Sequence, residues 1–274
     1  MGLVIPFEIG QVFTNNRGDS AKIIKLIGGS KYKSRKAKIR FEDGTVTEVA
    51  TSKLNSGSWK NPNKPVVCGV GFIGQGKYNK KHKDGLSRAY TKWNSMLRRC
   101  YNEGDKGWEN YGKVGVTVCK EWHNFQNFAE WFYRHDYSSR ELSLDKDIKY
   151  PYGFTGNLYC PDYCCLVSMR INNKMMGIGT LTVMKRREEV SNWVILDNGI
   201  SIYSSFDENL IKFMLSEVRL KKLLEIRRDI ERCDRVEEGT IKAIDVKIYN
   251  YTKDVVMEDK KLFLEHIRSK IESN

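Results

Sequence analysis

The sequence predicts an α+β fold with a small β module in residues 1–57, a basic glycine-rich linker in residues 58–86, a central αββα domain in residues 87–177 and a C-terminal α+β unit in residues 178–274. Three observations predict this fold. Short apolar segments separated by turn residues fill the first module, aromatic residues recur at helical spacing in the central domain, and a hairpin signal precedes amphipathic segments near the C-terminus. With 274 residues and 40% hydrophobic content, the chain can bury a substantial core.

The N-terminal module is expected to form an SH3-like barrel or a curled sheet. Short strands are predicted at Val12–Phe13, Ile23–Ile27, Ala37–Phe41 and Val46–Val49, with turn residues between them. Cations crowd the third of these strands and the residues before it: Lys31, Lys33, Arg35, Lys36, Lys38 and Arg40. One edge or face of the module should therefore be strongly positive and suited to following a nucleic-acid backbone without reading bases.

The connection from residue 58 to residue 86 is rich in glycine, lysine and asparagine, and it carries the cations Lys77, Lys80, Lys81 and Lys83. Its glycines match neither a dinucleotide-binding fingerprint nor a P-loop. The composition favours a flexible basic linker or an arm that becomes ordered on DNA.

A helix is predicted over Ser87–Tyr101, because apolar residues recur there at helical spacing. Its other face presents four cations: Arg88, Lys92, Arg98 and Arg99. These side chains are expected to face phosphates or bases, while an ordinary solvated helix face is the alternative. A strand at Val114–Cys119 and an aromatic-rich helix at Asn124–His135 are predicted to follow.

The positive charge is confined to the N-terminal half of the chain. Residues 1–140 hold 25 lysines and arginines against 12 acidic residues, whereas residues 141–274 hold 22 of each. Such segregation is typical of a surface that neutralises phosphates, so DNA is the expected partner. The alternative is a surface that only improves solubility, for which the charge would be spread along the chain.

The composition also indicates where in the cell the protein resides and whether it binds zinc. No apolar run approaches 18 residues and no signal-peptide pattern opens the chain, so a cytoplasmic protein without a membrane partner is expected. Seven scattered cysteines indicate reduced thiols and not a disulfide framework. The spacing Cys160-x3-Cys164-Cys165 lacks the paired knuckles of structural zinc sites, which argues against zinc.

The segment from Leu144 to Asn173 carries the chemistry. Alternation over Leu144–Ile148 predicts a short strand with Asp145 and Asp147 on one face. A second strand is predicted around Leu166–Val167, and a helix is predicted to open at Arg170–Lys174. Two carboxylates and a carboxamide would then converge across a hairpin, and such oxygen ligands suit Mg²⁺ or another divalent cation.

At these residues the chain resembles the HNH superfamily of ββα-metal nucleases, and in particular a divergent group common in bacteriophage genomes. The motif LDKDI, a tyrosine-rich strand and a terminal asparagine carry the resemblance, which extends over about residues 7–175. It implies that Asp145 binds the metal and that Asn172 or Asn173 is the helix ligand. The family places its water-activating histidine directly after the aspartate, where this chain has Lys146.

Lysine is protonated at neutral pH and cannot accept a proton unless its pKa is depressed. Lys146 therefore departs from the catalytic pattern. His123 and His135 flank the predicted aromatic helix, and His123 is the candidate for a replacement proton acceptor. A capping or surface role is the alternative for both histidines.

The C-terminal unit is predicted to hold a hairpin, in which strands Trp193–Leu196 and Ile200–Tyr203 flank a turn at Asp197–Gly199. Ser205 begins a capping box for a long helix that reaches about Cys233. Ile241–Tyr251 is predicted as a strand and Met257–Ser273 as a final amphipathic helix. Balanced charge and two helices fit a homodimer or a contact with another protein.

Two classes of function follow. The first is a phage-type DNA-binding protein whose HNH-like site acts as a metal-dependent nickase or endonuclease. The second is a non-enzymatic phage regulator or anti-defence protein that binds DNA or inhibits a host protein, with the degenerate hairpin as a scaffold that needs no cofactor. Lys146 favours the second class.

Overall fold

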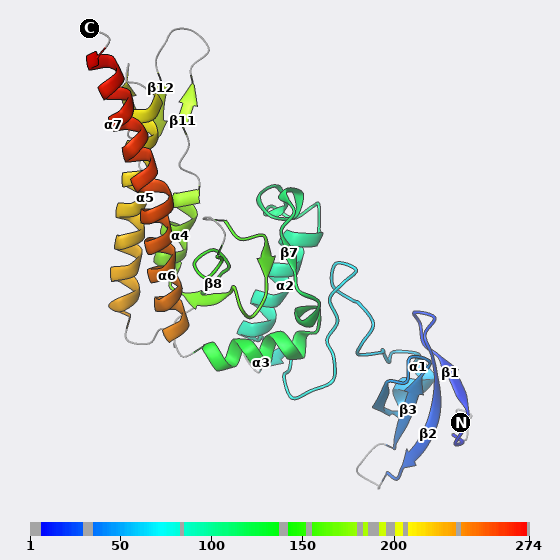
Figure 1. Ribbon diagram of the computed structural model, residues 1–274. Helices are drawn as coiled ribbons and strands as arrows, with labels where there is room; N and C mark the ends of the chain where they lie inside the picture. The colour runs from blue at the N-terminus through cyan, green and yellow to red at the C-terminus, as the bar shows by residue number, and fades with distance from the viewer. Residues whose placement is uncertain are drawn as a thin grey trace. The chain divides into compact units, whose positions relative to one another are not determined.

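The computed structural model describes residues 7–29, 35–82, 85–136, 142–151, 155–179, 183–185, 192–195, 201–204, 208–233 and 237–272. Predictions for Lys31, Lys33 and Lys83, for the turn Asp197–Gly199 and for the helix cap at Ser205 lie outside these residues. The chain divides into two compact units, Met1–Asn79 with His123–Gln126 and Lys80–Trp122 with Asn127–Asn274. The fold is α+β, as predicted (Figure 1).

The first unit begins with a four-stranded antiparallel sheet whose strands follow chain order. The strands are β1 (Val12–Thr14), β2 (Ser20–Ile27), β3 (Lys36–Phe41) and β4 (Val46–Ala50), which confirms the four predicted strands. One face of the sheet packs into a core that holds Ala21, Ile23, Ala37, Ile39, Phe41, Val49, Leu54 and Trp59. The other face remains polar, which is common for an antiparallel sheet.

Helix α1 (Thr51–Ser56) closes the module and ends at Gly57, whose φ is 63°. A Cβ atom at this position would lie 2.2 Å from the side-chain oxygen of Asn16, so glycine satisfies both the left-handed backbone and the close approach. The adjacent amide of Asn16 donates to the Gly57 carbonyl at 3.0 Å. The helix end is thereby fixed against the turn that follows β1.

The glycine-rich connection after α1 is held by specific contacts, in contrast to the expected flexible linker. The buried side chain of Gln126 donates to the carbonyls of Ile73 and Tyr78 and accepts from the amide of Tyr78. A Cβ atom on Gly76 would lie 2.2 Å from the Gln126 side-chain oxygen. The glycine spacing therefore serves close packing, which composition alone did not reveal.

The second unit opens with the two-residue strands β5 (Lys81–His82) and β6 (Gly85–Leu86), followed by α2 (Arg88–Tyr101). Ser87 caps α2 by accepting from the amide of Tyr90, and the predicted apolar stripe is buried. The short helices η1 (Trp108–Asn110), η2 (Gly112–Val114) and η3 (Lys120–His123) and strand β7 (Thr117–Val118) precede α3 (Phe125–His135). The predicted strand at Val114–Cys119 is thus shortened to two residues.

A hairpin of β8 (Ser143–Asp145) and β10 (Cys165–Val167) follows α3, and α4 (Met169–Gly179) continues from it. The strands pair antiparallel, with Asp145 opposite Cys165. Between them, β9 (Leu158–Tyr159) pairs parallel with β7. The predicted second strand and the predicted helix start are confirmed, while the first strand ends at Asp145 and does not extend to Asp147.

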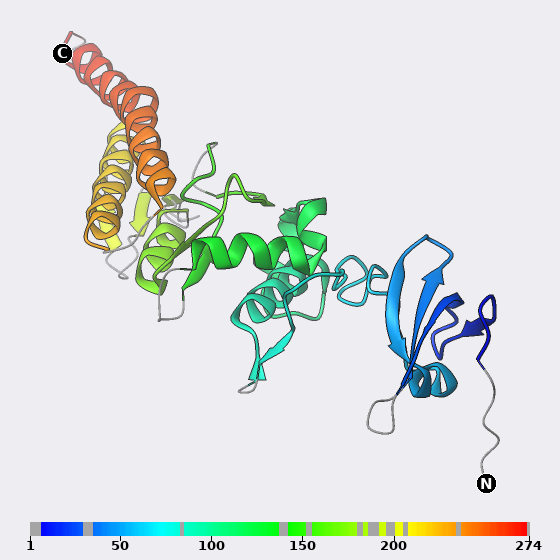
Figure 2. The same cartoon turned by 90° about the horizontal axis from the view of Figure 1, so that it is seen from below.

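The C-terminal hairpin is present as β12 (Asn192–Ile195) and β13 (Ser201–Ser204), with β11 (Val183–Lys185) as a third strand. The three helices that follow are α5 (Glu208–Glu231), α6 (Glu238–Tyr251) and α7 (Met257–Glu272), with the π-helical turn η4 (Thr252–Val256) joining the last two. Figures 1 and 2 show α6 and α7 running on from one another beside α5. The predictions of α5 and α7 are confirmed.

The predicted strand at Ile241–Tyr251 is wrong, because this segment forms most of α6. Its β-branched isoleucines favoured a strand by propensity. Ile241, Ile244 and Ile248 instead recur at helical spacing and pack with the residues of α5 in one core. Tertiary packing therefore outweighed local propensity.

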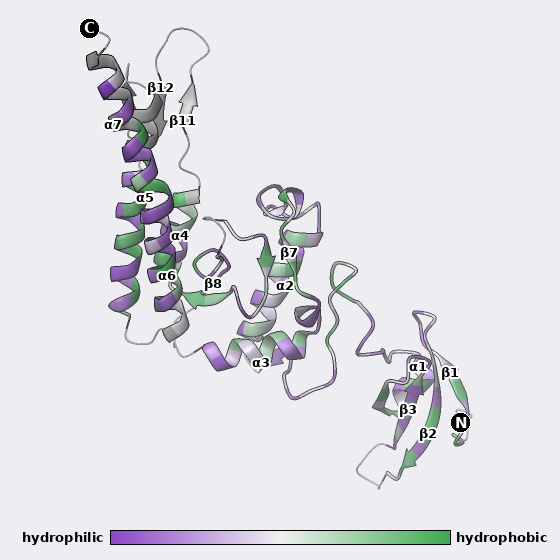
Figure 3. Cartoon of the chain, in the orientation of Figure 1, coloured by the Kyte–Doolittle hydropathy of each residue, from purple (hydrophilic) through white to green (hydrophobic). Residues whose placement is uncertain are grey.

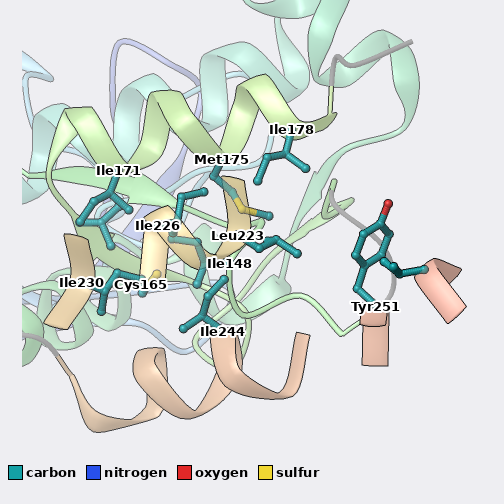
Figure 4. Packing of buried hydrophobic residues seen from close by; sticks show 12 residues of the cluster. Ile148, Cys165, Ile171, Met175, Ile178, Leu223, Ile226, Ile230, Ile244 and Tyr251 are labelled. Atoms are coloured by element: carbon teal, nitrogen blue, oxygen red, sulfur yellow. The ribbon is translucent and has the colours of Figure 1, made fainter. Parts of the chain in front are cut away.

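One core joins the hairpin to these helices. It contains Ile148, Cys165, Val167, Ile171, Met175, Ile178, Leu223, Ile226, Ile230, Ile244, Tyr251 and Val256. Figure 4 shows Ile171 and Met175 of α4 in the same cluster as Leu223 and Ile226 of α5. Hydrophilic and hydrophobic residues both line α5 and α7 (Figure 3). No helix in the described ranges is long and apolar enough to cross a membrane.

Candidate functional site

The β8–β10 hairpin carries a charged cluster that is almost fully buried. Asp145, Lys146 and Asp147 are 1%, 4% and 8% exposed. Charged side chains are almost never buried to this degree unless they are paired. The partners of these three residues therefore decide what the hairpin can do.

Asp145 stabilises the turn that ends β8. Its Oδ1 accepts from the backbone amides of Asp147 at 2.9 Å and Ile148 at 2.8 Å. An aspartate that accepts from amides two and three residues ahead is typical of an Asx turn, which explains why the strand stops here. Its Oδ2 is buried and has no hydrogen-bond partner within the described part of the chain.

Lys146 pairs with its neighbour. Its Nζ donates to Asp147 Oδ1 at 2.7 Å, and the amide of Gly156 donates to the same oxygen at 2.6 Å. Lys146 Nζ also lies 5.3 Å from the ring centroid of Tyr111 and 5.9 Å from that of Tyr159. The ammonium is therefore engaged by a carboxylate and by two aromatic rings inside the cluster.

Arg99 joins the same tyrosines, although the sequence placed it on a helix face toward nucleic acid. Its guanidinium carbon lies 4.8 Å from the ring centroid of Tyr111 and 4.9 Å from that of Tyr159. Its Nε is buried and has no hydrogen-bond partner among the described residues. Arg99 is therefore directed inward, and two carboxylates and two cations share one buried neighbourhood.

The electrostatics of this cluster act mainly on Asp145. Burial raises the pKa of Asp145 to about 6, and the charge of Asp147 adds to the effect. The amide donors of Ile148 and Asp147 and the charge of Lys146 act in the opposite direction. Loss of hydration therefore outweighs the hydrogen bonds and the nearby cation, which makes ionised Asp145 costly in the folded protein.

The residues expected to bind a metal ion fit a divalent cation poorly. Mg²⁺ retains several waters and requires about six oxygens, whereas Asp145 is buried and Asp147 already receives the Lys146 ammonium. Asn172 is half-buried and contacts Met176 Sδ at 3.5 Å, while Asn173 is exposed. Within the described ranges, no group of three or more histidine, cysteine or acidic side chains is arranged to hold a metal.

The other candidates for catalysis and metal binding have different surroundings. The carbonyl of His123 accepts from the amide of Phe72 in the first unit, whereas Asp145 belongs to the second unit. His135 Nδ1 lies 2.6 Å from the carbonyl of Trp131. All seven cysteines are free, and burial raises the pKa of Cys164 well above its ordinary value. That thiol is therefore held in its protonated form.

Cations predicted to bind nucleic acid on α2 are largely occupied by acidic partners. Arg88 Nη2 lies 3.0 Å from Asp136 Oδ1, and Arg98 Nε lies 3.2 Å from Asp105 Oδ2. Lys92 is half-buried. Together with the inward position of Arg99, these contacts leave α2 a weaker candidate for phosphate binding than the sequence indicated.

Cations of the connection lie along tyrosine rings or in a short strand. Lys77 Nζ lies 5.0 Å from the ring centroid of Tyr78, and Lys80 Nζ lies 5.3 Å from that of Tyr90. Lys81 is exposed in β5.

The sheet of the first unit does gather its cations on one face. Lys36, Lys38 and Arg40 alternate with the buried residues of β3, and Arg35 is exposed just before the strand. Because side chains two residues apart point to the same face, the three strand cations lie in a row. This face is opposite to the buried face of the sheet, which carries Ile23 and Ile39.

Two further cations that the sequence analysis missed complete this face. Lys22 pairs with Arg40 and Lys25 pairs with Lys38 across the β2–β3 register, although residues three apart point to opposite faces of a regular strand. The register shifts between Ile23 and Lys25, so a β-bulge brings both lysines to one side. Two adjacent apolar residues, Ile23 and Ile24, interrupt the alternation of apolar and polar residues in β2. This interruption is the feature of the sequence that could have indicated the bulge.

We call this surface the basic face and define it as Lys22, Lys25, Lys36, Lys38 and Arg40. Glu48 of β4 is the nearby acid on the same face, at 4.0 Å from Lys36 and 3.8 Å from Lys38. These distances lie at the weak end of ion pairing, and both partners are exposed. The face therefore keeps a large positive excess.

Comparisons of the chain with protein-family models, with curated proteins and with solved structures find no match.

Proposed function

We propose that the protein binds double-stranded DNA through the basic face, by contacts to the phosphate backbone. The observation that carries this proposal is the pairing of like charges directly across β2 and β3, Lys22 with Arg40 and Lys25 with Lys38. Like charges in opposite positions destabilise a sheet, by roughly the same 0.2–1 kcal/mol that opposite charges contribute. A surface that carries this cost, with Glu48 as its weakly paired acid, is suited to a polyanion.

The shape of the basic face also supports backbone binding. The three cations of β3 span four intervals of the strand, which is about 13 Å at 3.3 Å per residue. The lysines of β2 form a second row at the spacing of neighbouring strands, about 4.8 Å away. An array of strand cations neutralises several phosphates at once but presents no helix to a groove, so we expect little sequence preference.

The buried Asp145–Lys146–Asp147 cluster serves in this proposal as a scaffold. Its carboxylates are engaged by a neighbouring ammonium and by backbone amides. A lysine in an ion pair cannot replace the water-activating histidine of an HNH site. A plasmid-nicking assay with Mg²⁺ or Mn²⁺ tests this assignment, because nicking by the native chain that is lost in Asp145→Ala would overturn it.

Fluorescence anisotropy with a labelled duplex of about 20 base pairs tests DNA binding. The variant in which Lys22 and Arg40 are both replaced by serine should bind at least tenfold more weakly. A matched control replaces Lys53 and Lys60, which are exposed cations of the same unit outside the basic face. Equal affinity of the two variants would contradict the proposed interface.

A further inference from the structure

A cavity of about 730 Å³ lies in the second unit, apart from the basic face. The segment Lys149–Pro151 forms one side of it, and residues of α6 and η4 form the other. Pockets of about 300–1,000 Å³ hold small organic molecules, so this one is far larger than inorganic phosphate requires. The ligand should therefore have an organic part as well as any charged group.

The lining of the cavity has a positive excess. Four cations contribute to it, Lys149, Arg219, Lys242 and Lys247, against the two carboxylates of Asp162 and Asp254. Lys149 shares its charge with Glu237 at 3.5 Å. The excess of cations over carboxylates in the lining favours an anionic ligand over a neutral or cationic one.

Lys247 is a partly buried cation of the lining. Its Nζ donates to the carbonyl of Tyr150 at 2.7 Å, which fixes the ammonium at the wall between α6 and the opposite segment. Burial lowers the pKa of Lys247 to about 8, while the charges of Asp147 and Asp145 act in the opposite direction. An anion at this wall would stabilise the charged form that burial disfavours.

The rest of the lining is aromatic and apolar. Tyr150 lies edge-on against Tyr163, with ring centroids 5.4 Å apart and an angle of 90° between the rings. Tyr251 and Val255 line the helical side, and Pro151 lines the opposite segment. Aromatic and apolar walls with a few convergent polar groups suit a flat organic ring.

We propose that this cavity binds a nucleoside phosphate, with the base against Tyr150 and Tyr251 and the phosphate toward Lys247 and Lys242. The combination of a ring-sized apolar volume and a cationic wall supports this chemical class. The ligand is either a free mononucleotide or the terminal nucleotide of a nucleic-acid strand. The proposal does not depend on DNA binding by the basic face, which belongs to the other unit.

Isothermal titration calorimetry of the full-length chain tests the site. The titrants are the four common nucleoside monophosphates, adenosine, inorganic phosphate and a short 5′-phosphorylated oligonucleotide. At least one nucleoside monophosphate or the oligonucleotide should bind at least tenfold more tightly than adenosine and phosphate. Tighter binding of the mononucleotide identifies the free nucleotide as the ligand. Tighter binding of the oligonucleotide identifies the strand end if Lys247→Met abolishes the difference, because the basic face would also bind an oligonucleotide.

Variants place the binding in this cavity. Lys247→Met should reduce the affinity at least tenfold, and Lys242→Met, at an exposed position, should reduce it several-fold without a change in the thermal unfolding midpoint. Lys260→Met, an exposed position of α7 outside the cavity, should leave it unchanged. The proposal is overturned if no titrant binds, if Lys242→Met binds like the native chain, or if all three variants lose affinity equally.

Discussion

Replacement of Asp145 by asparagine should favour the folded protein increasingly as the pH rises. The substitution keeps a side-chain oxygen that can accept from the amides of Asp147 and Ile148. It removes a charge from a position that is 1% exposed. It also places an amide group where Oδ2 has no partner among the described residues. A buried donor left without an acceptor costs about 1–3 kcal/mol.

The magnitude follows from the pKa of Asp145, which burial raises to about 6 from an ordinary 3.8. Because the folded-state pKa is the higher one, the native protein is most stable with respect to this group below pH 3.8 and loses stability as the pH rises through about 6. The difference between these two pKa values corresponds to about 3 kcal/mol in the free energy of unfolding, at about 1.4 kcal/mol for each pKa unit. About 1–2 kcal/mol of it falls between about pH 5 and pH 8.

Urea denaturation at these two pH values, in the presence of a chelator, measures the effect for the native chain and Asp145→Asn. The free energy of unfolding of the variant, relative to the native chain, should rise by about 1–2 kcal/mol from about pH 5 to pH 8. Asp162→Asn, at an exposed position, is the matched control and should show no comparable change. A difference that is independent of pH, or that falls toward pH 8, would refute the electrostatic reasoning.

Three further predictions follow from the contacts of the charged residues and of one glycine. Lys146→Met should destabilise the fold by about 3–5 kcal/mol, because it leaves Asp147 buried without its cation, and urea denaturation would count against the ion pair if the loss were below about 1 kcal/mol. Lys25→Glu should stabilise the sheet by about 0.2–1 kcal/mol, because it creates an attractive pair with Lys38. The same substitution should weaken DNA binding, and an unchanged DNA affinity would show that Lys25 lies outside the interface. Gly76→Ala should lower the free energy of unfolding by about 1–3 kcal/mol, because its Cβ would clash with the hydrogen-bonded side chain of Gln126. A thermal unfolding midpoint equal to that of the native chain would show that the connection rearranges to accept the methyl group.

Local patterns predicted much of the fold. The four N-terminal strands, the apolar stripe of α2 and the β10–α4 junction follow from periodicity and turn residues. The segment Ile241–Tyr251 was mistaken for a strand, because its isoleucines satisfy β propensity and their helical spacing matters only once α5 is in place. The role of Gly76 likewise depends on Gln126, which is distant in sequence.

The candidate site was predicted only in outline. The sequence identified the hairpin and its acidic residues, but burial and pairing depend on tertiary contacts that no local pattern encodes. The sequence predicts that Arg99 faces phosphates or bases, whereas its position between Tyr111 and Tyr159 results from packing of segments far apart in the chain. Lys22 and Lys25 join the basic face through a bulge that only the strand register reveals.

The salt dependence of DNA affinity tests the central claim most directly. If all five cations of the basic face contact phosphates, the slope of log K against log salt concentration should approach about −4.5 for the native chain. Replacement of both Lys25 and Lys38 by serine should make the slope less steep by about 2. A native slope near zero, or a slope that these substitutions leave unchanged, would contradict DNA binding through the basic face.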